Sequence, residues 1–357
     1  MKRFSIFHAS AWLAAAALCA AQAVAQDGAG ELEHPSDYLR VTNYPGGFVG
    51  ADRESWRDAV PEIEDIEIPS SAGASPQKAL YFDSGSEQAK PLLVVLHSWS
   101  TGYLQNIDIP IAEFAKANDW VFMHPNFRGA NDGDPQTTAS QLVLSDMQDA
   151  LRYARENANV DESRIYLMGY SGGAMNALHL ARLNPDVFAG TSIWVPVYDL
   201  VDWYEWNAQR GEKYAGEIEG ACGGKPTADE AAKEECRKRS PSTHMSKVAG
   251  DVPILIAHGI DDETVPPDYA LRAFSDLAEK GDAIDPALFD QLRSKRQIPE
   301  SLRSRHVNDG GLVGFEQADA DVLLHLKSGP AELVLFEGEH DMLYRPGLEW
   351  LARQRRD

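Results

Sequence analysis

The sequence predicts an α/β fold in which a doubly wound, mostly parallel β-sheet carries helices and is interrupted by two insertions near the face that bears the candidate site. Three observations lead to this prediction. Short apolar runs alternate with helical stretches over most of the chain. The run Leu92–Leu96 is continuous and rich in Val and Leu, as in a strand buried on both faces. A glycine-rich turn, residues 169–173, joins one apolar run to an alanine-rich helical stretch.

The elements follow from periodicity and from the residues that end each run. Alternation of apolar and acidic residues indicates a half-buried first strand, and the later runs are short and apolar. The expected strands are Ile63–Ile68, Ala79–Phe82, Leu92–Leu96, Val121–Met123, Ile165–Met168, Gly190–Val195, Ile254–His258 and Leu333–Phe336. The expected helices are Ile109–Ala117, Leu142–Asn157, Ala174–Leu183 and Pro346–Arg353. Both insertions, about 198–247 and about 281–327, follow carboxyl ends of strands, where open α/β sheets bind ligands.

The beginning of the chain has the pattern of a secretory signal peptide. Lys2 and Arg3 precede a short apolar run that ends at Val24, and Ala23-Val24-Ala25 is a small-residue cleavage site. The alternative is an uncleaved signal anchor. We expect a signal peptide over 1–25, an N-terminal extension over 26–60 and a catalytic domain over 61–357. The expected location is therefore periplasmic or extracellular, without a membrane anchor.

Charge and cysteine content narrow the class further. The formal net charge is -22, which argues against nucleic acid and anionic membranes as partners. Cys222 and Cys236 are close in sequence, and an exported chain meets an oxidising compartment, so we expect a disulfide; the alternative is two free thiols. We expect no metal site: the Asn131–Asp134 turn lacks a full calcium-loop pattern. The absence of phosphate-loop and dinucleotide motifs predicts no cofactor.

The candidate nucleophile is Ser171, in the pentapeptide Gly169-Tyr170-Ser171-Gly172-Gly173. The expected strand before it and helix after it match a tight strand-to-helix turn that lifts a serine above the sheet. Side chains two residues away on either side would collide, which explains the outer glycines. The alternative is a structural glycine-rich turn.

A serine nucleophile needs a base and an acid that orients the base, in the chain order Ser, Asp or Glu, His. Asp262 follows the expected strand that ends at His258, and His340 follows the last expected strand. Asp261 is the rival of Asp262. The other histidines, His97, His124, His179, His244, His258, His306 and His325, have positions more typical of structural or surface roles.

Two backbone N–H groups must stabilise the oxyanion. Gly172 supplies one, and the loop after Leu96 supplies the other, with Trp99 preferred and Ser98 as the alternative. Trp99, Tyr170 and Trp203 are the expected substrate-binding residues. The aromatic residues of 198–206 suit sugar rings and aryl acids, although they equally fit an aromatic core that packs the insertion on the sheet.

With these residues identified, the chain from about Lys78 to Arg353 resembles the prolyl-oligopeptidase-like branch of the α/β-hydrolases. RIYLMGYSGGAMNALHLA is similar to that branch's nucleophile region, HGIDDETVP to its acid loop, FEGEH to its histidine loop and HPNFRGA to its Asn-x-Arg-Gly segment. The resemblance implies an α/β-hydrolase fold and favours Asp262 over Asp261. Ser98 and Trp99 depart from the branch, which usually has glycines there. Too few residues precede the first expected strand for the N-terminal propeller of the family's peptidases.

The expected function is that of a serine hydrolase that forms an acyl-enzyme. An alkoxide leaves more readily than an amine, so we favour a carboxylic ester hydrolase acting on small-molecule or oligosaccharide esters. The alternative is a prolyl-oligopeptidase-like serine peptidase that acts on short peptides. A third hypothesis is a non-catalytic binding protein on the same fold. The sequence makes no prediction of the oligomeric state.

Overall fold

The structure is a computed structural model that describes residues 31–248, 250, 253–308 and 310–356. Contacts divide the chain into a unit of residues 1–32 and a unit of residues 33–357, and the fold below is that of the second unit. The expected signal peptide and the first residues of the N-terminal extension lie outside the described residues. Within the described part of the chain, no helix is long and apolar enough to cross a membrane.

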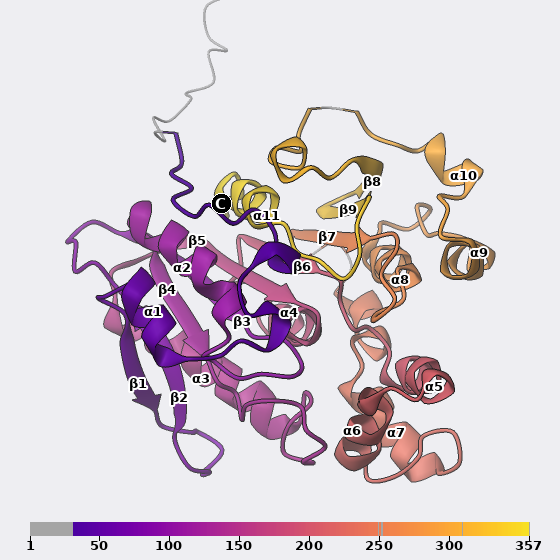
Figure 1. Cartoon of the computed structure of the whole chain (residues 1–357), viewed down its shortest axis with the longest axis horizontal. Helices are drawn as coiled ribbons and strands as arrows, with labels where there is room; N and C mark the ends of the chain where they lie inside the picture. Colours follow the sequence, from indigo (N-terminus) through magenta and orange to yellow (C-terminus); the bar gives the residue numbers. More distant parts are fainter. Residues whose placement is uncertain (1–30, 249, 251–252, 309, 357) are drawn as a thin grey trace, which may run out of the picture. The chain divides into compact units, whose positions relative to one another are not determined.

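The centre of the fold is one mixed sheet of nine strands in the described part of the chain, in the order β1-β2-β4-β3-β5-β6-β7-β9-β8 (Figure 1). The strands are β1 (Glu64–Ile68), β2 (Gln77–Phe82), β3 (Lys90–Leu96), β4 (Val121–Pro125), β5 (Val160–Tyr170), β6 (Gly190–Trp194), β7 (Ile254–Gly259), β8 (Val322–Ser328) and β9 (Ala331–Phe336). The six strands from β4 to β9 along the sheet order pair in parallel. The antiparallel pairs are β1 with β2, β2 with β4 and β8 with β9. The parallel strands bring their carboxyl ends to one edge of the sheet, where the candidate site lies.

Helices cover both faces of the sheet. Helices α2 (Ile109–Ala117) and α11 (Tyr344–Ala352) contact each other on one face. Helices α3 (Gln141–Asn157) and α4 (Gly172–Leu183) contact each other on the opposite face, which α8 (Asp268–Leu277) also covers. The expected doubly wound α/β fold is thus confirmed.

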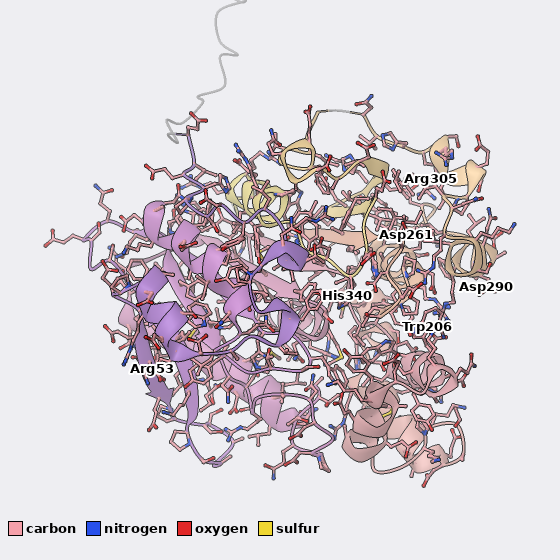
Figure 2. All side chains as sticks on the ribbon, viewed as in Figure 1. Arg53, Trp206, Asp261, Asp290, Arg305 and His340 are labelled. Carbon is pink, nitrogen blue, oxygen red and sulfur yellow. A yellow bond between two sulfur atoms is a disulfide. The ribbon has the colours of Figure 1, made fainter. Side chains whose placement is uncertain are left out.

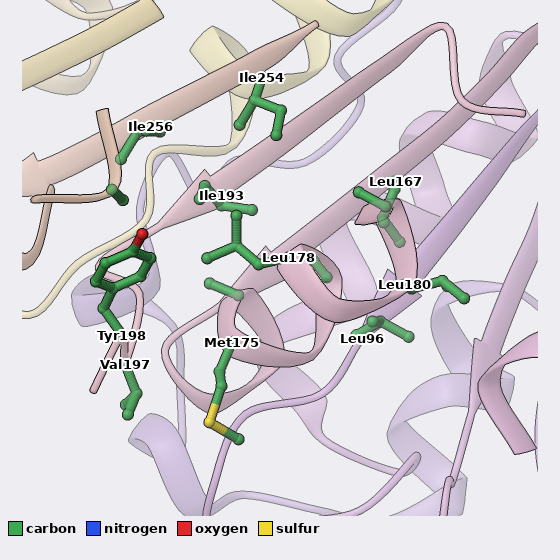
Figure 3. Packing of buried hydrophobic residues seen from close by; sticks show 14 of the residues in the cluster. Leu96, Leu167, Met175, Leu178, Leu180, Ile193, Val197, Tyr198, Ile254 and Ile256 are labelled. Atoms are coloured by element: carbon green, nitrogen blue, oxygen red, sulfur yellow. The ribbon is translucent and has the colours of Figure 1, made fainter. Parts of the chain in front are cut away.

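Part of the buried core lies under α4, where apolar side chains of the helix meet those of neighbouring parallel strands. Met175 and Leu178 of α4 are fully buried, and Leu178 lies beside Ile193 of β6 (Figure 3). Burial of an aliphatic side chain of this size stabilises a fold by roughly 1.5–3 kcal/mol. The helix after the candidate nucleophile is therefore held rigidly on the sheet.

Several elements differ from the sequence-based expectation. Strand β5 begins at Val160 and not at Ile165. The residues between these two positions are polar, so they lack the apolar pattern of a buried strand. Val160 pairs with Lys90 of β3, and regular pairing resumes at Ile165. Strand β8 falls at the end of the expected second insertion, where His325 and Lys327 interrupt the apolar pattern of an edge strand. Helix α8 was not expected at all. The second insertion therefore consists of α9 (Ala287–Lys295), α10 (Glu300–Arg303) and the turns around them.

The first insertion forms three helices, two of which are joined by a disulfide. These are α5 (Leu200–Arg210), α6 (Lys213–Cys222) and α7 (Glu230–Arg239), and Asp199 and Asp229 cap the N-termini of α5 and α7 with their side chains. Cys222 at the end of α6 is bonded to Cys236 in α7. Helices α6 and α7 lie side by side in Figure 1.

The N-terminal extension is also ordered from residue 33 onward within this unit. It contains the short helix α1 (Arg53–Ala59), which Asp52 caps, and two 3-10 turns, Val41–Asn43 and Gly47–Val49. Residues 40–52, here called the strap, cross from the loop after β9 to the loop after β3. Backbone and side-chain contacts hold the strap at both ends, as described below.

Candidate active site

Ser171 occupies a strained turn between β5 and α4. Its backbone has φ 56° and ψ −117°, a conformation that L-residues rarely adopt. A Cβ at Gly169 would lie 2.4 Å from the Gly173 carbonyl oxygen, and a Cβ at Gly173 would lie 2.0 Å from that of Leu96. The two outer glycines are therefore required by close backbone approach, as the motif predicts.

The side chains of Ser171, His340 and Asp262 form a continuous hydrogen-bond chain. His340 Nε2 lies 3.0 Å from Ser171 Oγ, and His340 Nδ1 lies 2.6 Å from Asp262 Oδ2. Since the carboxylate can only accept, Nδ1 carries the proton and Nε2 accepts from the serine hydroxyl. Ser171 is 5% exposed, so only a small part of the residue reaches the surface.

Asp262 is fully buried and accepts four hydrogen bonds. Oδ1 accepts from the backbone N–H groups of Thr264 and Val265, at 2.8 and 2.9 Å. Oδ2 accepts from His340 and also from His258 Nε2 at 3.1 Å. Burial alone would raise the pKa of Asp262, but the charge of His340 and the hydrogen bonds from His258 and His340 outweigh it and hold the pKa well below its usual value. The carboxylate therefore stays ionised, as an orienting acid must.

The rival residue, Asp261, faces elsewhere. Its side chain is exposed and lines a hollow of about 500 Å³ with Asp319, Asp321 and Glu337, while its backbone N–H donates to the Gly338 carbonyl. Figure 2 shows Asp261 beside the loop that carries His340. The geometry therefore places Asp262, and not Asp261, on the imidazole.

Two backbone N–H groups meet beside Ser171. A Cβ at Gly172 would lie 2.8 Å from the Trp99 nitrogen, so the Gly172 and Trp99 backbones are in close contact. Among the described residues, neither N–H has a hydrogen-bond acceptor. The N–H of Ser98, the alternative donor, is already bonded to Gln105 Oε1 at 3.1 Å. Gly172 also opens α4, whose N-terminus favours negative charge.

The expected substrate-binding aromatics have different positions. Trp99 is buried, and its indole Nε1 donates to Glu217 Oε2 of α6 at 2.7 Å. Trp203 is fully buried behind it, 4.8 Å from the Trp99 ring, and its Nε1 donates to the Thr264 carbonyl. Trp203 thus supports Trp99 and the acid loop, and its burial leaves no surface for a substrate. Tyr170 is buried, and its hydroxyl donates to the His340 carbonyl at 2.9 Å.

The remaining aromatic residues of 198–206 pack the first insertion on the sheet, which was the alternative to a role in binding sugar rings or aryl acids. Tyr198 and Tyr204 are buried, and Trp206 is partly exposed with Arg210 lying over its ring. The indole of Trp206 donates to the Glu263 carbonyl. These contacts attach α5 to the acid loop, so the run fastens the insertion to the site.

Other histidines are structural, with one exception. His97 and His179 are buried, and desolvation lowers their pKa to about 4 and about 3. His124 is buried and bonded to Asp108. The exception is His258, whose Nε2 donates to both Asp262 and the Val265 carbonyl. Its place at the end of an apolar strand was compatible with such a contact, but the pattern alone did not distinguish it from a core histidine.

Two residues that contact the site were not predicted from the sequence. Glu217 reaches Trp99 from α6, and Phe48 of the strap packs on the rings of Tyr170 and His340. Both lie far in sequence from the residues they contact. The described residues contain no group of three or more His, Cys, Asp or Glu side chains arranged to hold a metal ion.

The nucleophile turn, the imidazole and the buried carboxylate at the carboxyl edge of a doubly wound sheet define a serine hydrolase of the α/β-hydrolase class. The sequence model of the Prolyl oligopeptidase family matches residues 112–292. The chain belongs to the prolyl oligopeptidase family, which is a family of serine-type peptidases.

The individual relatives are distant in sequence, and the rice relative is much longer than this chain. Acylamino-acid-releasing enzyme 2 of rice (Oryza sativa subsp. japonica) is 25% identical over 252 residues, which are 66% of this chain and 31% of that protein. The uncharacterized peptidase YtmA of Bacillus subtilis is 27% identical over 156 residues, 43% of this chain and 56% of that protein. This chain thus spans about a third of the length of the rice relative.

Solved structures agree with the fold. A puromycin-hydrolyzing peptidase of Mycobacterium tuberculosis superposes with a TM-score of 0.50 at 15% identity, over 81% of this chain and 37% of that one. The acylaminoacyl peptidase of Pyrococcus horikoshii gives a TM-score of 0.48 at 17% identity, over 60% and 34%. The family match, and not these structures, favours the peptidase alternative over the ester hydrolase that we preferred from the sequence.

Proposed function

We propose that this protein is a serine peptidase that cleaves amide bonds in short peptides through an acyl-enzyme on Ser171. The observation that carries the proposal is the hydrogen-bond chain from Ser171 through His340 to Asp262. Membership of a serine-peptidase family supports the choice of an amide over an ester. The buried aromatic run of the first insertion supports it too, since that run was the main argument for a sugar ester.

Each group has a role that follows from its position. Ser171 Oγ attacks the scissile carbonyl carbon while His340 Nε2 takes its proton, and Asp262 stabilises the imidazolium that forms. The oxygen that gains negative charge lies between the Gly172 and Trp99 N–H groups, each of which contributes on the order of 10²–10³ in rate. His340 then gives the proton to the leaving nitrogen. Water, activated by the same imidazole, releases the acyl group.

Protonation of the leaving group is the step that makes amides accessible. An amine anion is a very poor leaving group, so the base must return its proton before the C–N bond breaks. The short contacts on both sides of His340 hold the ring where it can accept from Ser171 and donate to the substrate nitrogen. Tyr170 adds to this by fixing the His340 carbonyl.

We also propose that the mature protein is exported. The signal-peptide pattern of the first 25 residues supports this, and so does the Cys222–Cys236 disulfide, because such bonds persist in oxidising compartments.

Covalent labelling and a substrate panel test the peptidase proposal. An aryl phosphonate should label the wild-type chain once, at Ser171, and Ser171→Ala should take up no label. Aminoacyl and prolyl nitroanilides should be hydrolysed, with turnover at least about 10³-fold lower in Ser171→Ala and Asp262→Asn. Turnover of nitrophenyl esters alone, with anilides untouched, would return the assignment to an ester hydrolase. Labelling at another residue would remove Ser171 from the mechanism.

A further inference from the structure

Phe48 is an exposed aromatic residue beside the catalytic histidine. Its ring centroid lies 5.9 Å from that of Tyr170, nearly parallel at 14°, and 6.0 Å from that of His340, edge-on at 64°. Phe48 is nevertheless 38% exposed, and its neighbour Val49 is 69% exposed. Five large apolar side chains of the described residues are this exposed, and Phe48 and Val49 are the adjacent pair among them that has a ring contact with His340. An open apolar surface at a reacting group is available to a substrate.

The strap that carries Phe48 is held firmly. At one end, Val41 N–H donates to the Met342 carbonyl, and Thr42 donates through its N–H and hydroxyl to Asp341, the residue after His340. Arg40 pairs with the same carboxylate. The start of the strap is therefore fixed to the histidine loop.

The other end of the strap is fixed to the oxyanion loop. The Gly50 carbonyl accepts from the Asn106 N–H at 2.8 Å, and the Asp52 and Asn106 side chains bond each other. Gln105, which forms a bridge with Ala51, also accepts from the Ser98 N–H next to Trp99. Gly46 and Gly47 have φ of 84° and 61°, so the turn that presents Phe48 uses a left-handed backbone. Phe48 is thus held in place relative to both halves of the site.

The aromatic residues around Ser171 separate into two groups. Trp99 has ring contacts with Trp203 and Tyr214, on the side of the oxyanion donors. Phe48 has ring contacts with Tyr170 and His340, on the side of the imidazole. The leaving group must lie next to His340, because it takes its proton from Nε2. The residue after the scissile bond therefore lies on the Phe48 side.

We propose that Phe48, with Val49, forms an apolar subsite for the leaving-group residue of the peptide, so that the enzyme prefers an aromatic or aliphatic side chain directly after the scissile bond. This inference rests on the proposed peptidase function. It assigns a specificity role to a strap that lies outside the matched family segment, residues 112–292.

Partition of the acyl-enzyme measures this subsite by itself. An acyl-amino-acid nitrophenyl ester acylates Ser171, and an added amino-acid amide competes with water for the acyl group. In the transfer, the free α-amino group of the amino-acid amide attacks the carbonyl carbon of the acyl-enzyme ester and gives up a proton to His340. The bond from that carbon to the Ser171 oxygen then breaks, and the oxygen takes the proton from His340. The amine occupies the leaving-group side, while the acyl group stays the same in every assay. The ratio of transfer to phenylalanine amide and to glycine amide therefore reports the leaving-group subsite.

The wild-type chain should transfer to phenylalanine amide in preference to glycine amide. Phe48→Ala should lower that preference about two- to tenfold, the range expected for loss of one aromatic contact. Phe48→Leu should retain most of it, and Phe48→Asp should abolish it. Val313→Ala is the matched control, because Val313 is an exposed apolar residue of the second insertion with 40% exposure, and it should keep the wild-type ratio.

Several results would overturn the inference. For the wild type, these results are equal transfer to the two amides or no transfer to either. For Phe48→Ala, they are an unchanged transfer ratio or an effect confined to the choice of acyl residue. Intact-mass detection of the acyl-enzyme distinguishes failure of the subsite from failure of the proposed function. An acyl-enzyme on Ser171 without amide preference rejects the subsite alone, whereas no acyl-enzyme on Ser171 rejects the proposed function and the subsite together.

Discussion

At the scale of single residues, the three glycines of the nucleophile turn meet different constraints. Gly169 and Gly173 leave room for backbone atoms of neighbouring segments, so they decide whether the turn forms at all. Gly172 faces the Trp99 backbone, with Trp99 N, Cα and Cβ between 2.8 and 3.0 Å from its would-be Cβ. Its lack of a side chain therefore decides how closely the two oxyanion donors approach each other.

Substitutions at two adjacent glycines should separate these effects. Gly172→Ala has a φ that is ordinary for alanine, but its Cβ would lie 2.8 Å from the Trp99 nitrogen, so the Trp99 backbone must move away and kcat should fall on the order of 10²-fold as the donors part. Gly173→Ala should fail to accumulate as folded protein, because its Cβ meets the Leu96 carbonyl at 2.0 Å. Near-ultraviolet circular dichroism and anilide turnover measure the two outcomes. A fully active Gly172→Ala would contradict the assigned oxyanion donor.

At the scale of elements, helix α6 acts on the site although it carries none of the reacting groups. Glu217 accepts from the Trp99 indole, and Lys213, one turn earlier, pairs with Glu217 and donates to Ser100 Oγ. The disulfide joins the end of this helix to α7. The first insertion thus orients the loop that presents the Trp99 N–H.

Weakening the Glu217 contact should therefore slow acyl transfer. Glu217→Gln keeps the shape of the side chain but replaces a charge-assisted hydrogen bond by a neutral one, so kcat should fall several-fold with a smaller change in KM, on the order of 1 kcal/mol. Glu219→Gln is the matched control on the same helix, because Glu219 accepts from Tyr204 and does not contact Trp99. Steady-state measurements of kcat and KM for both variants test this prediction. Equal losses of kcat in the two variants would argue against a role specific to Glu217.

At the scale of the whole molecule, one buried histidine joins the insertion to the core. His179 of α4 donates through Nε2 to the Arg239 carbonyl of α7 and accepts from Arg182 Nε at Nδ1. Arg239, itself buried, donates to the carbonyls of Pro135 and Thr137. Both ring nitrogens of His179 are satisfied only in the neutral form, which fits the lowering of its pKa to about 3 by desolvation.

This arrangement predicts a loss of stability in mild acid. The unfolded chain takes up a proton on this histidine below its ordinary pKa of 6.5, whereas the folded protein does so only near pH 3. The stability that the neutral His179 gives to the folded protein is therefore fully present above pH 6.5 and is lost as the pH falls from 6.5 toward 3. By pH 5 the loss is about 2 kcal/mol.

Urea unfolding at pH 7 and pH 5 measures this loss directly. In His179→Gln, which keeps a donor and an acceptor but no titrating group, the difference in unfolding free energy between the two pH values should shrink by about 2 kcal/mol. An unchanged difference would show that another group carries the acid sensitivity.

The sequence by itself determined the local geometry at Ser171 and the order of the site residues. A strand, a glycine-rich turn and a helix are recognisable from neighbouring residues, because Gly169 must clear Gly173 four positions later, although Gly173 itself must clear the Leu96 carbonyl of β3. The acid loop and the histidine loop were identifiable for the same reason, since each directly follows an apolar strand. Strand β8 was missed because polar residues interrupt its apolar pattern. Helix α8 has a regular apolar face and follows two prolines, which are compatible with a helix start, so its sequence did contain the signal.

Only the tertiary structure decided which N–H groups and which aromatic side chains of the site are available to a substrate and which are bonded or buried. Ser98 loses its N–H to Gln105, Trp203 is buried behind Trp99, and Phe48 reaches His340 from almost 300 residues earlier in the chain. Each of these contacts joins segments that are distant in sequence, so no local pattern encodes it. The nucleophile is therefore a property of five consecutive residues, whereas the surfaces proposed to select its substrate depend on how the strap and the first insertion pack against the sheet.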